Sequence, residues 1–214
     1  MAPRTTTHDV DARAIAVLVT GYLVGLVAYP YLPGPFLQNA LSARLMVAFT
    51  LPTTALVIYA VFTNLWKHDR VRSGNGAFAS TYRAIVLRAL LFVVALHAIV
   101  MIELTDLMDA AGIRTVAGRM VIVILGLTFI AIGNLLPRTR PNVAVGVRTE
   151  RTLTNARLWR QVHRVGGYAT VGLGVVIFII GLVMTKKSAG ALVLGAAGVA
   201  AMVVLASYRK HARA

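Results

Sequence analysis

The sequence predicts an all-α fold: a polytopic transmembrane helical bundle of about six helices, with both termini in the cytoplasm. Of its 214 residues, 58% are hydrophobic and only 14% are charged, and the mean hydropathy is +0.76. These values exceed what a water-soluble core requires. The apolar residues also come in blocks of about 20, the length that crosses a bilayer as a helix. A transmembrane barrel would instead alternate apolar and polar residues, and no such alternation is visible.

Each apolar block predicts one helix, and together they predict a single integral membrane domain over residues 1–214. The turn-rich segment 71–80 is expected to separate a two-helix front unit from the rest. Lys186-Lys187-Ser188 is so short that the last two blocks should form an antiparallel hairpin. Its small residues Ala191, Gly195 and Gly198 predict close helix packing there. The six blocks are 13–32, 42–66, 83–104, 119–137, 166–185 and 189–207.

Positive charge is distributed unevenly between alternate loops. With the N-terminus inside, 16 of the 22 Lys and Arg residues fall on the inner side and five on the outer side. Such an excess is typical of cytoplasmic loops. The sequence therefore predicts a multi-pass protein of the cell membrane with its N- and C-termini inside. The formal net charge of +15 follows from this topology and does not indicate direct nucleic-acid binding.

Several classes of chemistry lack the residues that they need. The chain has no cysteine, which excludes disulfides, thiolate nucleophiles and Cys metal sites. Nucleophile-elbow, zinc-protease, phosphate-loop and dinucleotide motifs are also absent in a fitting context. We therefore expect no enzyme, no metal site and no cofactor.

The inner segment 138–165 is the most informative part of the chain, because it contains more than the positive charge that a generic loop needs. Pro137 and Pro141 predict the end of the fourth helix. Thr154 or Asn155 can cap a short helix that reaches about Val165. Helical spacing places two sets of residues on different faces of that helix. Trp159, Val162, His163 and Gly166 lie on one face, and Arg157, Arg160 and Arg164 lie on the other.

The order of polar residues along this segment resembles the signature of the SdpI family of bacterial membrane proteins. In that signature a Gly-Asn helix end is followed by N-x-x-x-G-[IV]-R-T, then by T-L, by W and by H-R-x-G-G. The chain has Glu150-Arg151 where the family usually has Pro-Trp. The matching residues are Gly133, Asn134, Asn142, Gly146, Val147, Arg148, Thr149, Thr152, Leu153, Trp159, His163, Arg164, Gly166 and Gly167.

This resemblance implies a membrane immunity protein or signal receptor. Such a protein would give resistance to a secreted peptide toxin and could bind a cytoplasmic repressor-type protein, with membrane lipids as its surroundings. Asn134 and Asn142 would bond backbone groups at the proline-broken helix end, and Arg148 and Arg164 would hold phosphate headgroups or an acidic surface. The expected binding or motif residues are Asn134, Asn142, Gly146, Arg148, Thr149, Thr152, Asn155, Trp159, His163 and Arg164.

Polar residues within and beyond the third helix suggest alternatives. His97 lies inside the apolar block, and ionisable residues in a membrane are functional candidates. Glu103, Asp106 and Asp109 at the outer end could form a site for a cationic peptide or a metal ion, or simply a solvated helix end. Together with the Arg- and His-rich inner loop, His97 favours a transporter or lipid-handling protein as the alternative function. A structural role in an assembly is a third reading, because the small residues of the last hairpin could pair between chains.

Overall fold

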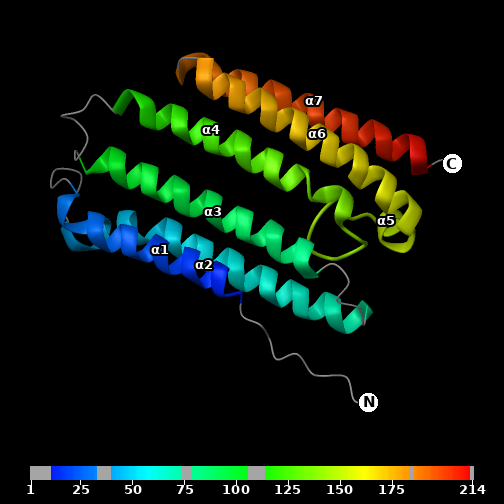
Figure 1. Ribbon diagram of the computed structural model, residues 1–214, viewed down its shortest axis with the longest axis horizontal. Helices are drawn as coiled ribbons and strands as arrows, with labels where there is room; N and C mark the ends of the chain where they lie inside the picture. The colour runs from blue at the N-terminus through cyan, green and yellow to red at the C-terminus, as the bar shows by residue number, and fades with distance from the viewer. Residues whose placement is uncertain (1–10, 33–39, 74–78, 106–113, 184–185, 213–214) are drawn as a thin grey trace.

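The computed structural model describes residues 11–32, 40–73, 79–105, 114–183 and 186–212. Within these ranges the chain is helical and contains no strand, which confirms the predicted fold class (Figure 1). The α-helices are α1 (Ala12–Ala28), α2 (Ala40–Ser73), α3 (Ala79–Leu104), α4 (Arg114–Gly133), α5 (Glu150–Thr154), α6 (Ala156–Val183) and α7 (Lys186–Ala212). Two 3-10 turns, η1 (Tyr29–Tyr31) and η3 (Leu136–Arg138), follow α1 and α4.

The long helices have the length and composition of membrane spans. Five stretches among the described residues qualify, and they fall in α1, α2, α3, α4 and α6. Large apolar side chains cover the outside of the bundle: Val27 and Met46 are each 67% exposed and Val183 is 74% exposed. An exposed apolar surface of this extent is stable in lipid and costly in water. The chain is therefore a multi-pass membrane protein.

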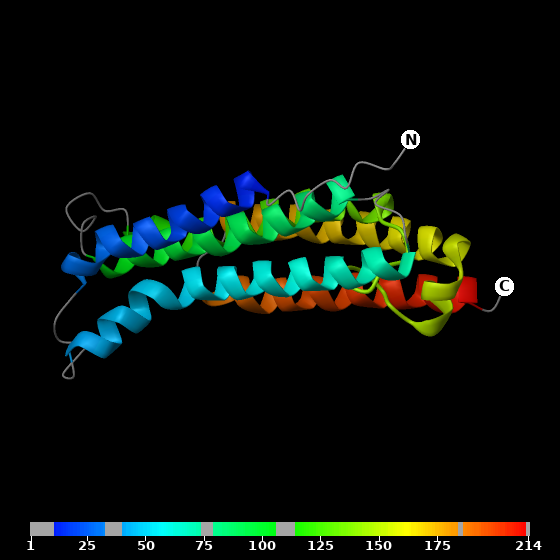
Figure 2. The same cartoon turned by 90° about the horizontal axis from the view of Figure 1, so that it is seen from below.

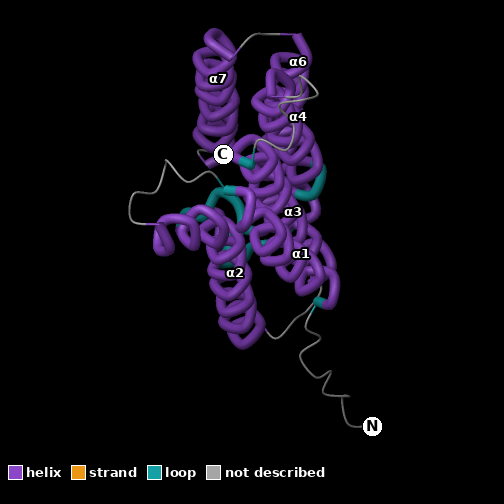
Figure 3. Tube along the Cα trace, turned by 90° about the vertical axis from the view of Figure 1, so that its left-hand side faces the viewer, coloured by secondary structure: helices purple, strands orange, loops and turns teal. Residues whose placement is uncertain are grey.

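The helices form two groups of three that meet where α3 packs on α4 (Figure 3). The first group contains α1, α2 and α3, and the second contains α4, α6 and α7. The expected two-helix front unit is therefore wrong, because α3 shares a buried core with α1 and α2. That core includes Leu18, Ala55, Tyr82 and Leu90. Residues 74–78 of the link itself lie outside the described residues.

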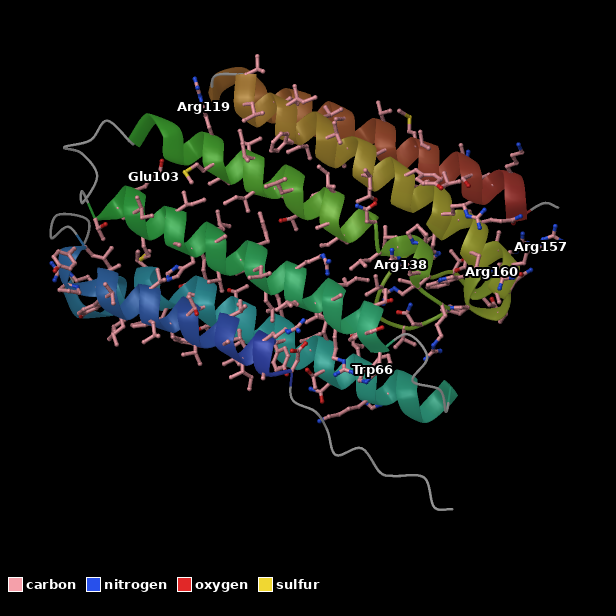
Figure 4. All side chains as sticks on the ribbon, viewed as in Figure 1. Trp66, Glu103, Arg119, Arg138, Arg157 and Arg160 are labelled. Atoms are coloured by element: carbon pink, nitrogen blue, oxygen red, sulfur yellow. The ribbon has the colours of Figure 1, made fainter. Side chains whose placement is uncertain are left out.

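Consecutive long helices run in opposite directions, so the segments between them gather at two ends of the bundle. Figure 4 shows Trp66, Arg138, Arg157 and Arg160 at one end and Glu103 with Arg119 at the other. The first end is called the motif end, because it contains residues 138–163. The described segments predicted to be cytoplasmic thus share one end of the molecule.

Glycines bring α4 and α6 together more closely than any side chain would allow. A Cβ on Gly174 would lie 2.7 Å from the Gly126 carbonyl oxygen and 2.7 Å from the Ile130 nitrogen. We expected such packing in the final hairpin instead. That expectation is wrong for Gly198, around which a Cβ would meet nothing within 4 Å. The surroundings of Ala191 and Gly195 lie outside what the structure describes.

One continuous α6 replaces two predicted helices. We expected a short surface helix ending near Val165 and a separate span over 166–185, but α6 runs from Ala156 to Val183 without interruption. Glycine weakens a helix because it gains backbone freedom on unfolding. Here the glycine pair is held by packing, since a Cβ on Gly167 would lie 2.8 Å from the Pro137 ring. The irregular part of the motif segment is consequently short and ends at Thr149, where α5 begins.

Candidate functional site: a hydrogen-bonded cap at the motif end

The candidate site is the segment from Thr139 to His163, which we call the motif cap. It consists of an irregular loop over 139–149, the short helix α5 and the first two turns of α6. It lies at the end of the bundle where α4 finishes and α6 starts (Figure 1). Most of the residues predicted to be functional fall within it.

Asn142 shapes the first half of the loop. Its side chain is 3% exposed, and its Oδ1 accepts hydrogen bonds from the backbone N–H groups of Ala144 (2.9 Å) and Val145 (2.8 Å). Its Nδ2 donates to the carbonyls of Arg140 (2.7 Å) and Val145 (3.2 Å). Asparagine commonly closes turns in this way. Asn142 thus bonds backbone groups as expected, but those of its own loop and not those at the end of α4.

His163 anchors the second half of the loop to α6. The backbone N–H of Val147 donates to Nε2 (3.0 Å), and Nδ1 lies 2.8 Å from the Trp159 carbonyl oxygen. An amide N–H can only donate, so Nε2 must accept and the ring proton must be on Nδ1. His163 is 2% exposed. The ring is therefore a neutral imidazole with both nitrogens bonded to the backbone.

Gly146 makes this contact feasible. Its φ is 109°, the left-handed region that glycine adopts most readily. A Cβ at this position would overlap Nε2 of His163. The glycine of the family signature is thus required twice, once by its backbone conformation and once by the close approach of the imidazole.

Trp159 joins the start of α6 to the end of α4. Its indole is fully buried and stacks on the His163 ring, with centroids 3.8 Å apart and an angle of 14° between the planes. Its Nε1 donates to the Thr139 carbonyl (3.1 Å) and lies 3.2 Å from the Thr139 hydroxyl. That hydroxyl donates to the Leu136 carbonyl (2.7 Å). Trp159 and His163 both face inward, as predicted.

Two caps start the helices of this segment. Thr149 caps α5 in a reciprocal arrangement with Thr152, whose fully buried hydroxyl donates to the Val147 carbonyl (2.7 Å) and accepts from the Thr149 N–H (2.9 Å). Oδ1 of Asn155 accepts from the N–H groups of Arg157 and Leu158, both at 3.0 Å. Of the two caps considered from the sequence, Asn155 is the one used for α6. Glu150, which replaces the family's usual Pro, is the first residue of α5, where a negative charge favours the helix dipole.

We expect Thr152→Val to destabilise the folded protein by about 1–3 kcal/mol, because it leaves the partly buried Val147 carbonyl and Thr149 N–H without their partner. Thermal unfolding in detergent micelles measures the effect. The matched control is Thr154→Val, since Thr154 lies in the same helix, is exposed, and bonds only carbonyls of its own helix. Equal unfolding temperatures for the two variants would contradict the role given to Thr152.

The outer surface of the motif cap and the adjoining turns is basic. Glu150 is the one exposed acidic residue among residues 138–164. Arg148 donates through Nη1 to the Val143 carbonyl, which holds its guanidinium against the loop. Guanidinium groups bind phosphates and carboxylates through paired hydrogen bonds. The exposed arginines are Arg138, Arg148, Arg151, Arg157, Arg160 and Arg164.

The predicted residues thus divide into an interior and a surface. The side chains of Asn142, Thr152, Trp159 and His163 form the buried interior, which Thr149 and Asn155 support as caps. Arg148 and Arg164 lie on the exposed surface. The side chain of Asn134 is also exposed, and no hydrogen bond is found for it within the described ranges. His163 is therefore buried, whereas the neighbouring Arg148 and Arg164 are exposed.

The other predicted polar residues lie away from the motif cap. His97 is fully buried within α3, and Glu103 is partly buried near the end of α3 at the opposite end of the bundle (Figure 4). Asp106 and Asp109 lie outside the described residues. Among the residues that are described, no three His, Asp or Glu side chains are grouped as metal ligands would be.

The contact between the cap and the first helix group was not predicted. Ala144 and Val145 pack against the buried cluster that contains Tyr82. Tyr82 in turn donates to the Phe62 carbonyl (2.6 Å) and lies 5.0 Å from the Trp66 ring. The aromatic residues Phe62, Trp66 and Tyr82 were the feature of the sequence that could have indicated this contact. The motif cap thereby touches both groups of helices.

The comparisons with known proteins agree with this picture. Searches of curated proteins and of solved structures gave no match. A sequence model of the SdpI/YfhL protein family matches residues 138–208, which run from the end of η3 through the motif cap and α6 into α7. The match confirms the resemblance found in the motif residues. This chain is therefore a multi-pass membrane protein whose residues 138–208 match the SdpI/YfhL protein family.

Proposed function

We propose that this protein is an SdpI-like membrane immunity protein and receptor, which gives resistance to a secreted peptide toxin. In this proposal the motif cap lies at the cytoplasmic surface of the cell membrane and binds an acidic partner, such as a repressor-type protein. The single observation that carries it is the construction of the cap: a buried polar network, in the region that matches the family, holds a basic surface in place.

The buried network supports a binding role because it fixes the loop. The polar side chains of Thr139, Asn142, Thr152 and His163 are nearly or fully buried, and each has hydrogen-bond partners. A loop that only needed positive charge would require none of these bonds. A surface that is ordered before its partner arrives loses less conformational entropy on binding.

The charge of the cap supports an acidic partner and a cytoplasmic location. Lysine and arginine are enriched in cytoplasmic loops of membrane proteins, and residues 138–164 include six exposed arginines. In this proposal both chain termini lie inside. A toxin peptide would meet the opposite end, near Glu103, or the lipid-facing surface of the bundle.

The state of His163 supports a non-enzymatic role for the cap. A general acid or base must be able to exchange a proton with its substrate. Both nitrogens of His163 are bonded to backbone groups of the protein itself. The imidazole therefore serves to hold the loop, and the exposed arginines are left as binding groups.

The test of the cap is survival of toxin-sensitive bacteria that express Arg148→Ala. We expect resistance to be lost while the protein remains in the membrane, because the exposed guanidinium next to the loop turn is removed. Arg119→Ala is the matched control: it also removes an exposed arginine, but from the opposite end (Figure 4). Retained resistance in Arg148→Ala, at an equal protein level, would overturn the proposed role of the cap.

A transporter or lipid-handling protein is the second candidate, and the fully buried His97 is the observation that favours it. Intramembrane ionisable residues often mark the path of a substrate or ion. Reconstituted vesicles should then show a substrate flux that His97→Ala or Arg148→Ala reduces. A flux that is the same in both variants as in the unaltered protein would remove this candidate.

A further inference from the structure

The contacts of His97 do not explain why a polar side chain is buried at this position. It is 0% exposed within α3, and neither ring nitrogen has a hydrogen-bond partner within the described part of the chain. His163 shows the contrast, because both of its nitrogens are bonded. In native proteins, a buried polar atom without a partner commonly marks an ordered water or ion that completes its bonding.

A second polar atom faces the same place from α2. Pro52 lies inside this helix, and proline has no N–H to donate to the carbonyl four residues earlier. The carbonyl of Ala48 therefore lacks its helical donor. Ala48 is 0% exposed, and Pro52 is also fully buried. Such freed carbonyls in membrane helices are bonded by neighbouring side chains or by ordered water.

Gly25 of α1 brings the two polar atoms together. A Cβ at Gly25 would overlap the Ala48 carbonyl oxygen and would lie 3.3 Å from Nε2 of His97. The free carbonyl of Ala48 and Nε2 of His97 thus both lie next to Gly25, where α1 contributes no side chain. They are near enough for a single water molecule to hydrogen-bond to both.

We propose that Gly25, Ala48 and His97 form an intramembrane hydration site that holds one water molecule. The water donates a hydrogen bond to the Ala48 carbonyl and exchanges a second bond with Nε2 of His97. The two polar groups, one carbonyl and one imidazole, suit an uncharged molecule that both donates and accepts.

The site lies where α2 departs from a straight path. The N-terminal part of α2 angles away from the rest of that helix (Figure 2), and proline is a common cause of such a bend. His97 is seven residues from the Leu104 end of α3, or about 10 Å along the helix axis. The water therefore joins α2 to α3 inside the apolar layer, beside the bend. This inference does not depend on the immunity role.

Solid-state NMR of protein labelled with ¹⁵N-histidine in lipid bilayers tests the site. Polarisation transfer from water protons to imidazole nitrogens shows which histidines contact water, and the signal missing from His97→Leu assigns His97. We expect transfer to His97 in the unaltered protein. His163 is the internal control, because its nitrogens are bonded to Val147 and Trp159 and should show none.

Two variants remove the site in different ways. Gly25→Ala places a methyl group between the two polar atoms, and Pro52→Ala restores the helical N–H that bonds the Ala48 carbonyl. Both should lose the transfer to His97, and Pro52→Ala provides the result if Gly25→Ala fails to fold. The absence of transfer to His97 in the unaltered protein would overturn the proposal, as would unchanged transfer in the folded variants.

Discussion

Gly146→Ala is expected to destabilise the protein by about 2–4 kcal/mol, one of the two largest effects we predict for a single methyl group. Two costs combine in this estimate. The left-handed φ of 109° strains any residue that has a Cβ. The added carbon also overlaps Nε2 of His163, so the bond from the Val147 N–H must break or the ring must leave its stack on Trp159.

Thermal unfolding in detergent micelles, followed by helical circular dichroism and by tryptophan fluorescence, measures this change. Gly198→Ala is the control, because a Cβ on that glycine would meet nothing within 4 Å. It should be neutral or slightly stabilising, since alanine favours a helix more than glycine does. An unfolding temperature for Gly146→Ala equal to that of the control would show that the loop does not approach His163 as described.

The second large loss of stability is expected from a glycine in the middle of α6, and a second glycine two residues away provides the comparison. Gly174→Ala should cost about 1–3 kcal/mol, because the new methyl group meets backbone atoms of α4 that cannot rotate away. Its nearest atoms are the Gly126 carbonyl oxygen and the Ile130 nitrogen, both at 2.7 Å. Gly172→Ala should instead stabilise the helix by about 0.5–1 kcal/mol, since its Cβ meets nothing within 4 Å.

Denaturant unfolding of the two alanine variants side by side gives the comparison. The substitutions are chemically identical and lie two residues apart in α6, so membrane insertion and helix propensity change equally in both. A difference in the predicted direction measures the close packing of α4 on α6. Equal stability of the two variants would mean that the glycine contacts do not hold these helices together.

Features set by local sequence were predicted correctly. The apolar blocks gave the number and approximate positions of the long helices, because each block must satisfy its own backbone within lipid. Helical spacing placed Trp159 and His163 on the buried face and Arg157 on the exposed one. The cap at Asn155 was one of two candidates, since Ser, Thr, Asp and Asn all cap helices.

Features set by contacts between distant residues could not be predicted. Helical spacing does not reveal that the Val147 N–H bonds a ring 16 residues later. The Gly166-Gly167 pair suggested a boundary between two helices. In the structure, Gly167 packs on Pro137 and α6 continues through it. Glycine-rich stretches likewise signalled close packing in general, but the partner helix that each glycine touches depends on the assembled bundle.

The assembled bundle also explains why the signature residues differ so much in exposure. Gly146, Thr152, Trp159 and His163 hold the cap together, and their loss should act through stability. Arg148 and Arg164 contribute little to the buried network, and their loss should act through binding. Unfolding and resistance measured on the same variants separate the two groups.

The most direct test of the proposed role is survival under toxin challenge. Toxin-sensitive bacteria that express the unaltered chain, and the same bacteria with an empty vector, would be exposed to a secreted membrane-active peptide toxin. The immunity role predicts that cells with the chain survive doses that kill the vector control. Equal killing at every dose, with the protein correctly inserted in the membrane, would contradict it.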